Sequence, residues 1–262
     1  MIASTVTLGR ETEPLLALCI HNGHDLPAAL ETTIGISEAD RLREEDPYTE
    51  VFAFRFANRL CVHTSRFAVD LNRSPSKAVY LKPEDCWGLP VRKQPLAPEL
   101  LASLQDDHRQ WYELLSYTAI RFLEKHEHLL VLDLHSFNHR RQGPGQPPDP
   151  QAQNPDIILG TNNMPDCHLP WVEAVRQTLD GAMLLGKPLD CRINVKFTGG
   201  YCSRWLHQCF AGRLTCLAVE FKKTFMDEWT GEVHEHKQQS LAELFAAAVY
   251  DTLPQWMNGW RD

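Results

Sequence analysis

A chain of 262 residues has room for one large α/β domain or two small ones, and it is long enough to bury a substantial hydrophobic core. Its residues are 43% hydrophobic and 23% charged, which excludes the collagen-like, low-complexity and intrinsically disordered classes. The formal net charge of -8 gives no electrostatic basis for binding nucleic acid or anionic lipid, so we expect neither as a partner.

The apolar segments of the chain are short. The longest, residues 15–20 and 129–132, fall far below the ~20 residues that a membrane span needs, and the first residues lack the basic and apolar regions of a secretory signal. Eight cysteines without a C-x-x-C pair, among them Cys202, Cys209 and Cys216 at intervals of seven, are expected to be buried free thiols. We therefore expect a cytoplasmic protein that does not contact membranes.

The first predicted element is a strand over residues 15–20, which form an unbroken apolar run. Ser37 with Asp40 is typical of a helix N-cap. A further helix is expected over residues 47–59, because its first residue is a proline, which suits the first turn. Residues 60–69 alternate well enough to predict the second strand.

The longest predicted helix comes next and leads into the most hydrophobic strand. Apolar residues at helical spacing predict a helix over residues 98–127, and the strand follows at residues 129–134. The segment Gly143–Pro150 is rich in Pro and Gly and can form neither a helix nor a central strand, so we expect a surface loop there. The remaining predicted elements are a strand at 156–159, a helix at 170–185, a strand at 214–221 and a helix at 236–252.

Strand-length runs that alternate with helices indicate βαβ units and a mostly parallel sheet. The chain shows no internal repeat and no linker-like tract. We therefore expect one α/β domain over residues 1–262, with a central, mostly parallel mixed sheet flanked by helices.

Three strand-like runs end at residues suited to metal chemistry. His21 follows the first strand, His135 follows the third, and Glu220 lies near the end of the last. Because ligands collect beyond the carboxyl ends of parallel strands, we expect these side chains to meet. Imidazole is a good zinc ligand, and a catalytic zinc usually takes three protein ligands, of which the third is His24 or a carboxylate from residues 44–46. The alternative is that these histidines are ordinary polar residues, as most single histidines are.

A carboxylate interrupts an otherwise apolar strand at Glu220. Burying it without a partner is costly, so it needs either a function or a counter-ion. Beside a zinc-bound water it would serve as general base and then as proton donor to the leaving amine. The alternative is an ion pair with Lys222, Lys223 or an arginine.

A second polar cluster consists of Arg66 and the turn Asp70-Leu-Asn-Arg73. Arginine presents a fork of donors that matches a carboxylate, so Arg66 or Arg73 is suited to hold an acidic substrate. Alternatively, Asp70 and Arg73 simply pair with each other and cap the turn. The pair Gly199-Gly200, followed by Arg204, either permits close backbone approach to a ligand or forms a plain turn.

Several motifs occur in a fixed order along the chain: His21-Asn-Gly, Ser65-Arg66, Asp70-Leu-Asn-Arg73, Asp133-Leu-His135-Ser136, Gly199-Gly200 and Val219-Glu220. In order and spacing they resemble the N-formylglutamate amidohydrolase family, from about residue 20 to 225. This family is related to the zinc carboxypeptidases and aspartoacylases. The resemblance implies a zinc-carboxypeptidase-like (phosphorylase/hydrolase-like) fold with a central mixed sheet. It also implies that one zinc ion assists hydrolysis of the amide of a small acidic N-acyl compound, as in N-formyl-L-glutamate plus water giving formate and glutamate.

The resemblance also implies roles for single residues. His21 and His135 match metal ligands, and Glu220 matches the general base. Substrate binding, or polarisation of the substrate carbonyl, is implied for Arg66, Asn72 and Arg73, with Gly199, Gly200 and Arg204 as further substrate-side residues.

The sequence departs from these relatives at one metal ligand. The zinc carboxypeptidases have His-x-x-Glu, whereas this chain has His24 three residues after His21. The third ligand is therefore His24, Asp46 or Glu45. Asp46 is favoured, because a carboxylate directly before a helix that begins with proline is suited to the mouth of the crevice.

In the resulting hypothesis, zinc lowers the pKa of a bound water to ~7 and Glu220 takes its proton. Arg66 or Arg73 stabilises the oxyanion or binds a substrate carboxylate, and the loop Gly143–Pro150 closes over the site. The alternatives are the same chemistry on another N-acylated amino acid or peptide, and a binding protein that keeps the fold without turnover. No motif indicates an oligomeric state.

Overall fold

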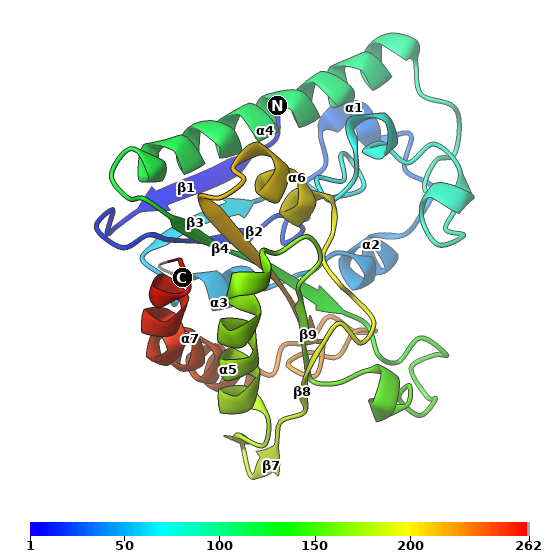
Figure 1. The fold of residues 1–262 in the computed structure, drawn as a ribbon. Helices are drawn as coiled ribbons and strands as arrows, with labels where there is room; N and C mark the ends of the chain where they lie inside the picture. The colour runs from blue at the N-terminus through cyan, green and yellow to red at the C-terminus, as the bar shows by residue number, and fades with distance from the viewer. Residues whose placement is uncertain (261–262) are drawn as a thin grey trace.

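A mixed sheet of seven strands forms the centre of the structure, a computed structural model in which residues 1–260 are described (Figure 1). Its strands are β1 (Ser4–Leu8), β2 (Leu15–Cys19), β3 (Asn58–Val62), β4 (Leu129–Phe137), β5 (Ile157–Gly160), β8 (Cys191–Ile193) and β9 (Leu214–Lys222). Their order in the sheet is β1-β3-β2-β4-β9-β5-β8. The four central strands, β3, β2, β4 and β9, are parallel, whereas β1 and β5 pair antiparallel with β3 and β9. The carboxyl ends of the central strands therefore share one edge of the sheet.

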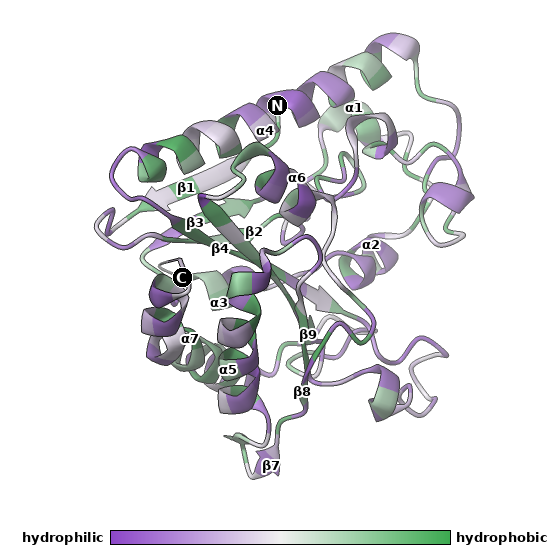
Figure 2. Ribbon diagram, in the orientation of Figure 1, coloured by the Kyte–Doolittle hydropathy of each residue, from purple (hydrophilic) through white to green (hydrophobic). Residues whose placement is uncertain are grey.

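Helices cover both faces of this sheet. They are α1 (Ala28–Glu31), α2 (Glu38–Glu44), α3 (Glu50–Ala53), α4 (Pro98–Leu123), α5 (Leu169–Leu179), α6 (Tyr201–Cys209) and α7 (Glu235–Asn258). Helices α4 and α6 pack on one face, and α3, α5 and α7 pack on the other (Figure 1). Two hydrophobic cores thus lie on opposite faces, and Figure 2 shows the apolar residues concentrated along the central strands between them.

The central strand β4 separates the two cores. All nine of its residues are buried, as expected for a parallel strand that is covered on both faces. Leu130, Leu132 and Leu134 face the core under α5 and α7, whereas Leu129 and Val131 face the core under α4. This alternation decides on which face each later side chain of the strand lies.

The predicted α/β fold with a mixed sheet is confirmed. The strands predicted at 15–20, 129–134, 156–159 and 214–221 correspond to β2, β4, β5 and β9, and the helices predicted at 98–127 and 236–252 correspond to α4 and α7. The predicted N-cap is also present, because Ser37 Oγ accepts a hydrogen bond from the Asp40 N–H at 3.0 Å.

The helix predicted over residues 47–59 is wrong. Only the four residues of α3 are helical in this segment. Tyr48 has a φ of 66°, which a continuous right-handed helix cannot contain, and β3 already begins at Asn58. The chain therefore makes a tight turn where the sequence favours a helix.

Two other predicted elements are too long. The strand predicted over residues 60–69 ends with β3, because residues 66–68 form a turn instead. The helix predicted over residues 170–185 ends with α5, before Gly181, whose φ of 80° terminates it. A small hairpin of β6 (Met183–Leu184) and β7 (Lys187–Pro188) follows.

The cysteines are all free, as expected. Six of the eight are buried, but Cys167 and Cys209 are exposed, so the prediction that Cys209 is buried is wrong. Cys209 is the last residue of α6, where the helix meets solvent. Among residues 1–260, no helix combines the length and the apolar character needed to cross a bilayer.

Candidate active site

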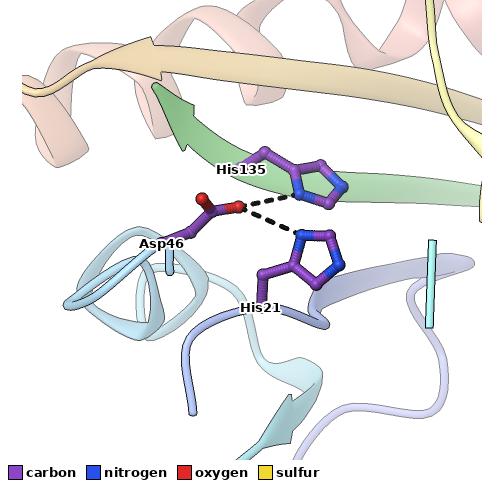
Figure 3. A group of neighbouring side chains, drawn as sticks. All are labelled: His21, Asp46 and His135. Carbon is purple, nitrogen blue, oxygen red and sulfur yellow. Dashed lines mark hydrogen bonds and ion pairs between the residues drawn. The ribbon is translucent and has the colours of Figure 1, made fainter. Parts of the chain in front are cut away.

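Three buried side chains from distant parts of the chain meet at the carboxyl edge of the sheet (Figure 3). His21 follows β2, Asp46 lies in the loop after α2, and His135 is near the end of β4. The Nδ1 atoms of His135 and His21 lie 3.0 Å and 3.4 Å from the same atom, Oδ2 of Asp46. One potential ligand atom from each residue lies within 4.8 Å of the other two, so these residues form a compact group, called here the metal group.

The far side of each imidazole ring faces a second carboxylate. His21 Nε2 is 2.8 Å from Asp70 Oδ1. His135 Nε2 is 3.0 Å from Asp133 Oδ1, although this contact is poorly aligned for a hydrogen bond. A carboxylate at Nε2 favours the tautomer with the proton there and leaves Nδ1 free to bind a cation. The donor set of two nitrogens and one carboxylate oxygen therefore fits a divalent metal ion such as zinc.

Contacts with the backbone hold Asp46 in this position. Its N–H donates to His21 O at 3.0 Å, and the Thr49 hydroxyl donates to the Asp46 carbonyl at 2.8 Å. The buried ammonium of Lys223 donates to the preceding carbonyl, Glu45 O, at 2.6 Å. Burial opposes ionisation of Asp46, but the two histidines, each of which carries a proton on Nδ1 as long as no cation takes its place, donate hydrogen bonds that outweigh burial and hold the pKa of this carboxyl far below its usual value. Asp46 therefore stays ionised, the form that binds a cation.

Glu220 lies beside the metal group. It is opposite His135 in the register of β4 and β9. Burial raises the pKa of its carboxyl to about 8, and the charge of His135 offsets this only in part. The alternative of an ion pair with the neighbouring lysines is wrong, because Lys222 Nζ contacts Asp156 at 2.7 Å and Lys223 Nζ donates to backbone carbonyls. Within residues 1–260 the Glu220 carboxylate has no ion-pair partner, so it is free to exchange a proton.

A cavity of about 310 Å³ lies next to these residues. It is lined by the metal group, by Glu220, and by the six residues predicted on the substrate side: Arg66, Asn72, Arg73, Gly199, Gly200 and Arg204. The structure thus brings these predicted residues together around one space.

Arg66 is fixed by Asp70, the residue that also faces His21. Its Nη2 donates to Asp70 Oδ2 at 2.8 Å and to the Tyr80 hydroxyl at 3.3 Å. Burial opposes a charge on Arg66, but Asp70 outweighs this effect and raises the pKa of the guanidinium above its usual value. Arg73 is 3.8 Å from Asp70, and its side chain is 42% exposed. The alternative in which Asp70 and Arg73 pair and cap the turn is thus present beside the closer pair with Arg66, because Asp70 Oδ1 also accepts a hydrogen bond from the Asn72 N–H at 2.8 Å.

Asn72 links its turn to the N-terminus of α6. Its Oδ1 accepts a hydrogen bond from the Cys202 N–H at 3.0 Å. A Cβ atom on Gly200 would lie 2.0 Å from that oxygen, and Gly199 has a φ of 109°, so both positions require glycine. The glycine pair therefore lets Asn72 pack against the helix at the cavity wall.

The other two candidate ligands lie outside the metal group. His24 Nδ1 is 2.5 Å from Glu45 Oε2, and this hydrogen bond raises the pKa of His24. Glu45 also accepts a hydrogen bond from the Ser65 hydroxyl. Asp46 is thus the candidate that the structure places with the two histidines.

The loop Gly143–Pro150, which was expected to close over the site, does not line the cavity. The Arg140 guanidinium donates to Pro144 O, and the Asp149 N–H donates to His139 O at 2.6 Å. These contacts hold the loop against the segment that follows β4.

Several residues that line the cavity were not predicted from the sequence. They are Trp87, Phe137, Asn138, Arg141, Phe197 and Tyr201, while Glu44, Ser136 and Lys223 were considered from the sequence but not as parts of the cavity wall. Ser136 and Asn138 carry a signal, because they are polar residues that continue past His135 at the end of a buried strand. The others come mostly from loops, where no periodic pattern marks them.

Comparisons with known proteins find a matching family model and two solved structures of similar fold. The family model of N-formylglutamate amidohydrolase matches residues 13–226. The crystal structure of N-formylglutamate amidohydrolase from Ralstonia eutropha JMP134 is similar, with 19% identity and a TM-score of 0.72 over 94% of this chain and 97% of that chain. A gene product from Agrobacterium tumefaciens is similar as well, with 17% identity and a TM-score of 0.72 over 97% of this chain and 96% of its own. No curated protein sequence matches the chain.

Proposed function

Because the chain belongs to the N-formylglutamate amidohydrolase family, we propose that it hydrolyses the amide of an N-formyl or related N-acyl acidic amino acid, with N-formyl-L-glutamate as the first candidate. One observation carries the proposal. The Glu220 carboxylate, without an ion-pair partner in the described part of the chain, lies beside the buried metal group in a cavity lined with arginines.

We assign one zinc ion to His21, Asp46 and His135. The ligand atoms would be Nδ1 of each histidine and Oδ2 of Asp46, and three protein ligands leave a position for water or substrate, as in catalytic zinc sites. When bound, such an ion acts as a Lewis acid and makes water easier to deprotonate. Asp70 and Asp133 would orient the two rings from behind.

Glu220 is the group that moves the proton in this proposal. In the metal-free protein burial raises its pKa to about 8, whereas a nearby divalent cation favours the ionised form. The carboxylate then accepts a proton from the attacking water and gives it to the departing amine. Both steps need a carboxylate that is not held by a counter-ion. Glu220 meets this requirement, because it has no ion-pair partner within residues 1–260.

The charge of the cavity supports an acidic substrate. The chain carries a net charge of -8, yet five cationic side chains line this cavity: Arg66, Arg73, Arg141, Arg204 and Lys223. Arg66 is buried and fixed near the metal group, which suits stabilisation of an oxyanion. The more exposed Arg73 is suited to bind a substrate carboxylate through its fork of donors.

The test is hydrolysis of N-formyl-L-glutamate by the purified protein, with formate release as the readout. We expect activity that a chelator removes and zinc restores, together with one bound zinc per chain. His135→Ala should lose both the zinc and the turnover. His24→Ala, the matched control outside the metal group, should keep both.

Rival substrates are tested in the same assay with N-acetyl and aminoacyl derivatives of glutamate and aspartate. Faster turnover of one of these would assign the activity to another acyl group. Ligand binding without any turnover by the zinc-loaded protein would contradict the proposal and favour a binding role.

A further inference from the structure

Two buried polar side chains at the end of β4 have no role in the metal group. Asn138 is 2% exposed, and its Oδ1 has no hydrogen-bond partner within residues 1–260. Ser136 is 5% exposed, and its hydroxyl likewise has none there. Both residues line the cavity. Since buried polar groups are nearly always paired, these two side chains at the cavity wall are suited to pair with a ligand.

These side chains lie on the opposite face of β4 from the metal group. His135 follows Val131 by four residues and so lies on the α4 face, whereas Ser136 follows the leucines that face α5 and α7. Asn138 directly follows the last residue of β4 and lines the same cavity. The cavity therefore reaches around the end of the strand and has two ends, with Arg73 on the α4 side.

A cation is present at the second end. Arg141 lines the cavity, and its Nη1 lies 3.6 Å from Glu44 Oε2. Glu44 is already bound more closely by Arg43, at 2.7 Å. The Arg141 guanidinium therefore has only a shared and distant counter-ion, and its side chain is 39% exposed. Lys223 adds a further positive charge to this end of the cavity.

We propose that Ser136, Asn138 and Arg141 form a second anion subsite, which binds the side-chain carboxylate of the substrate while Arg73 binds its α-carboxylate. This inference rests on the proposed function and deepens it. A guanidinium fork, a hydroxyl and an amide that can turn its NH₂ toward the ligand are all donors to a carboxylate. Two separate anion sites favour a dicarboxylate, because a substrate with one carboxylate leaves buried donors unpaired at the other site.

The test compares N-formyl-L-glutamate with N-formyl-L-glutamine, which has nearly the same shape but no side-chain charge. We expect the native protein to favour the glutamate substrate by about tenfold or more in kcat/KM. Arg141→Gln should reduce this preference to about threefold or less, through a higher KM for the glutamate substrate and little change for the glutamine substrate. Asn138→Ala should reduce it in part.

Arg140→Gln is the matched control. Arg140 is the neighbouring arginine, but it contacts Asp227 at 3.1 Å and does not line the cavity, so its loss should leave the preference unchanged. An Arg141→Gln protein that loses activity on both substrates equally, or keeps the native preference, overturns the subsite.

A binding measurement separates this inference from the proposed function. If the native protein turns over neither substrate, the proposed function fails, and calorimetry of the zinc-loaded protein with glutarate and its monoamide then decides about the subsite. A preference for glutarate that Arg141→Gln abolishes supports the subsite. Equal affinities in the native protein, or a preference that survives Arg141→Gln, overturn it.

Discussion

The proposed proton transfer by Glu220 depends on its having no ion-pair partner within residues 1–260. Glu220→Gln keeps the shape of the side chain but removes its ability to accept a proton. We expect kcat to fall by about 100-fold or more, because general base catalysis contributes about that much. Zinc content should stay unchanged, since Glu220 is not in the metal group. Steady-state kinetics and metal analysis check both points, and an active Glu220→Gln protein would contradict the assignment.

Asp133 is expected to act on the bound metal only through His135. Its carboxylate lies 3.0 Å from His135 Nε2 and is fully buried. We expect Asp133→Asn to weaken zinc binding by about 10- to 100-fold, because the backing charge makes the ring a better ligand. Competition with a chromogenic chelator measures the affinity, and Asp106→Asn on the exposed surface of α4 is the control. Unchanged zinc affinity would remove Asp133 from the site.

Single residues of the site could be predicted where they follow a recognisable strand. His21, His135 and Glu220 each stand at the end of an apolar run, and parallel strands bring such ends together. Asp46 required a choice among neighbours, which only the fold resolves. Arg141 could not be predicted, because it lies beyond β4 in an irregular segment and reaches the cavity through tertiary packing alone.

At the scale of elements, α4 holds the turn of residues 70–73, which borders the cavity, from outside. The Tyr112 hydroxyl donates to Leu71 O at 2.6 Å, and His108 Nε2 donates to Arg73 O at 3.0 Å. Burial lowers the pKa of His108, so the ring stays neutral at pH 7 and carries one N–H for this bond. The two bonds flank Asn72, so the helix fixes the turn on either side of it.

Loss of one of these bonds should affect substrate binding more than chemistry. We expect Tyr112→Phe to raise KM about three- to tenfold, which corresponds to about 1 kcal/mol for one hydrogen bond, with kcat changed less than twofold. Ser116→Ala, one turn further along α4, should behave like the native protein. A fall in kcat at constant KM would show that the turn acts in the chemical step instead.

Elements with a continuous apolar pattern could be predicted, whereas those defined by contacts could not. β4 and β9 have long buried runs, but β1 is an edge strand with mostly polar, half-exposed residues and β8 has only three residues. α6 begins directly after two glycines, which hide its start. The helix wrongly predicted over residues 47–59 suits its local sequence. The turn at Tyr48 replaces it, and the preceding Asp46 contacts His135.

At the scale of the whole molecule, buried histidines make stability depend on pH. Burial lowers the pKa of His168 and of His207 to about 4, from a usual value of 6.5. Between pH 6.5 and 4 the unfolded chain therefore binds protons that the folded protein does not, and the free energy of unfolding falls as the pH falls. The loss amounts to at most about 3 kcal/mol for each histidine.

Urea denaturation at pH 7.5 and at pH 5 measures this effect. We expect His168→Gln to lose less stability than the native protein between pH 7.5 and pH 5, by roughly half of the effect that these two histidines cause. His236→Gln, at an exposed position, should leave the difference unchanged. A difference that is the same in His168→Gln as in the native protein would exclude a contribution from His168.

The position of β9 has a consequence for how the polypeptide is made. β9 is the last strand in the sequence, yet it lies between β4 and β5 in the middle of the sheet. A ribosome-bound chain that ends before residue 214 therefore presents β4 with an unpaired edge, which is a template for association with other chains. Glu220 arrives with that strand, so the nascent chain acquires its proposed general base in the same step that closes the sheet.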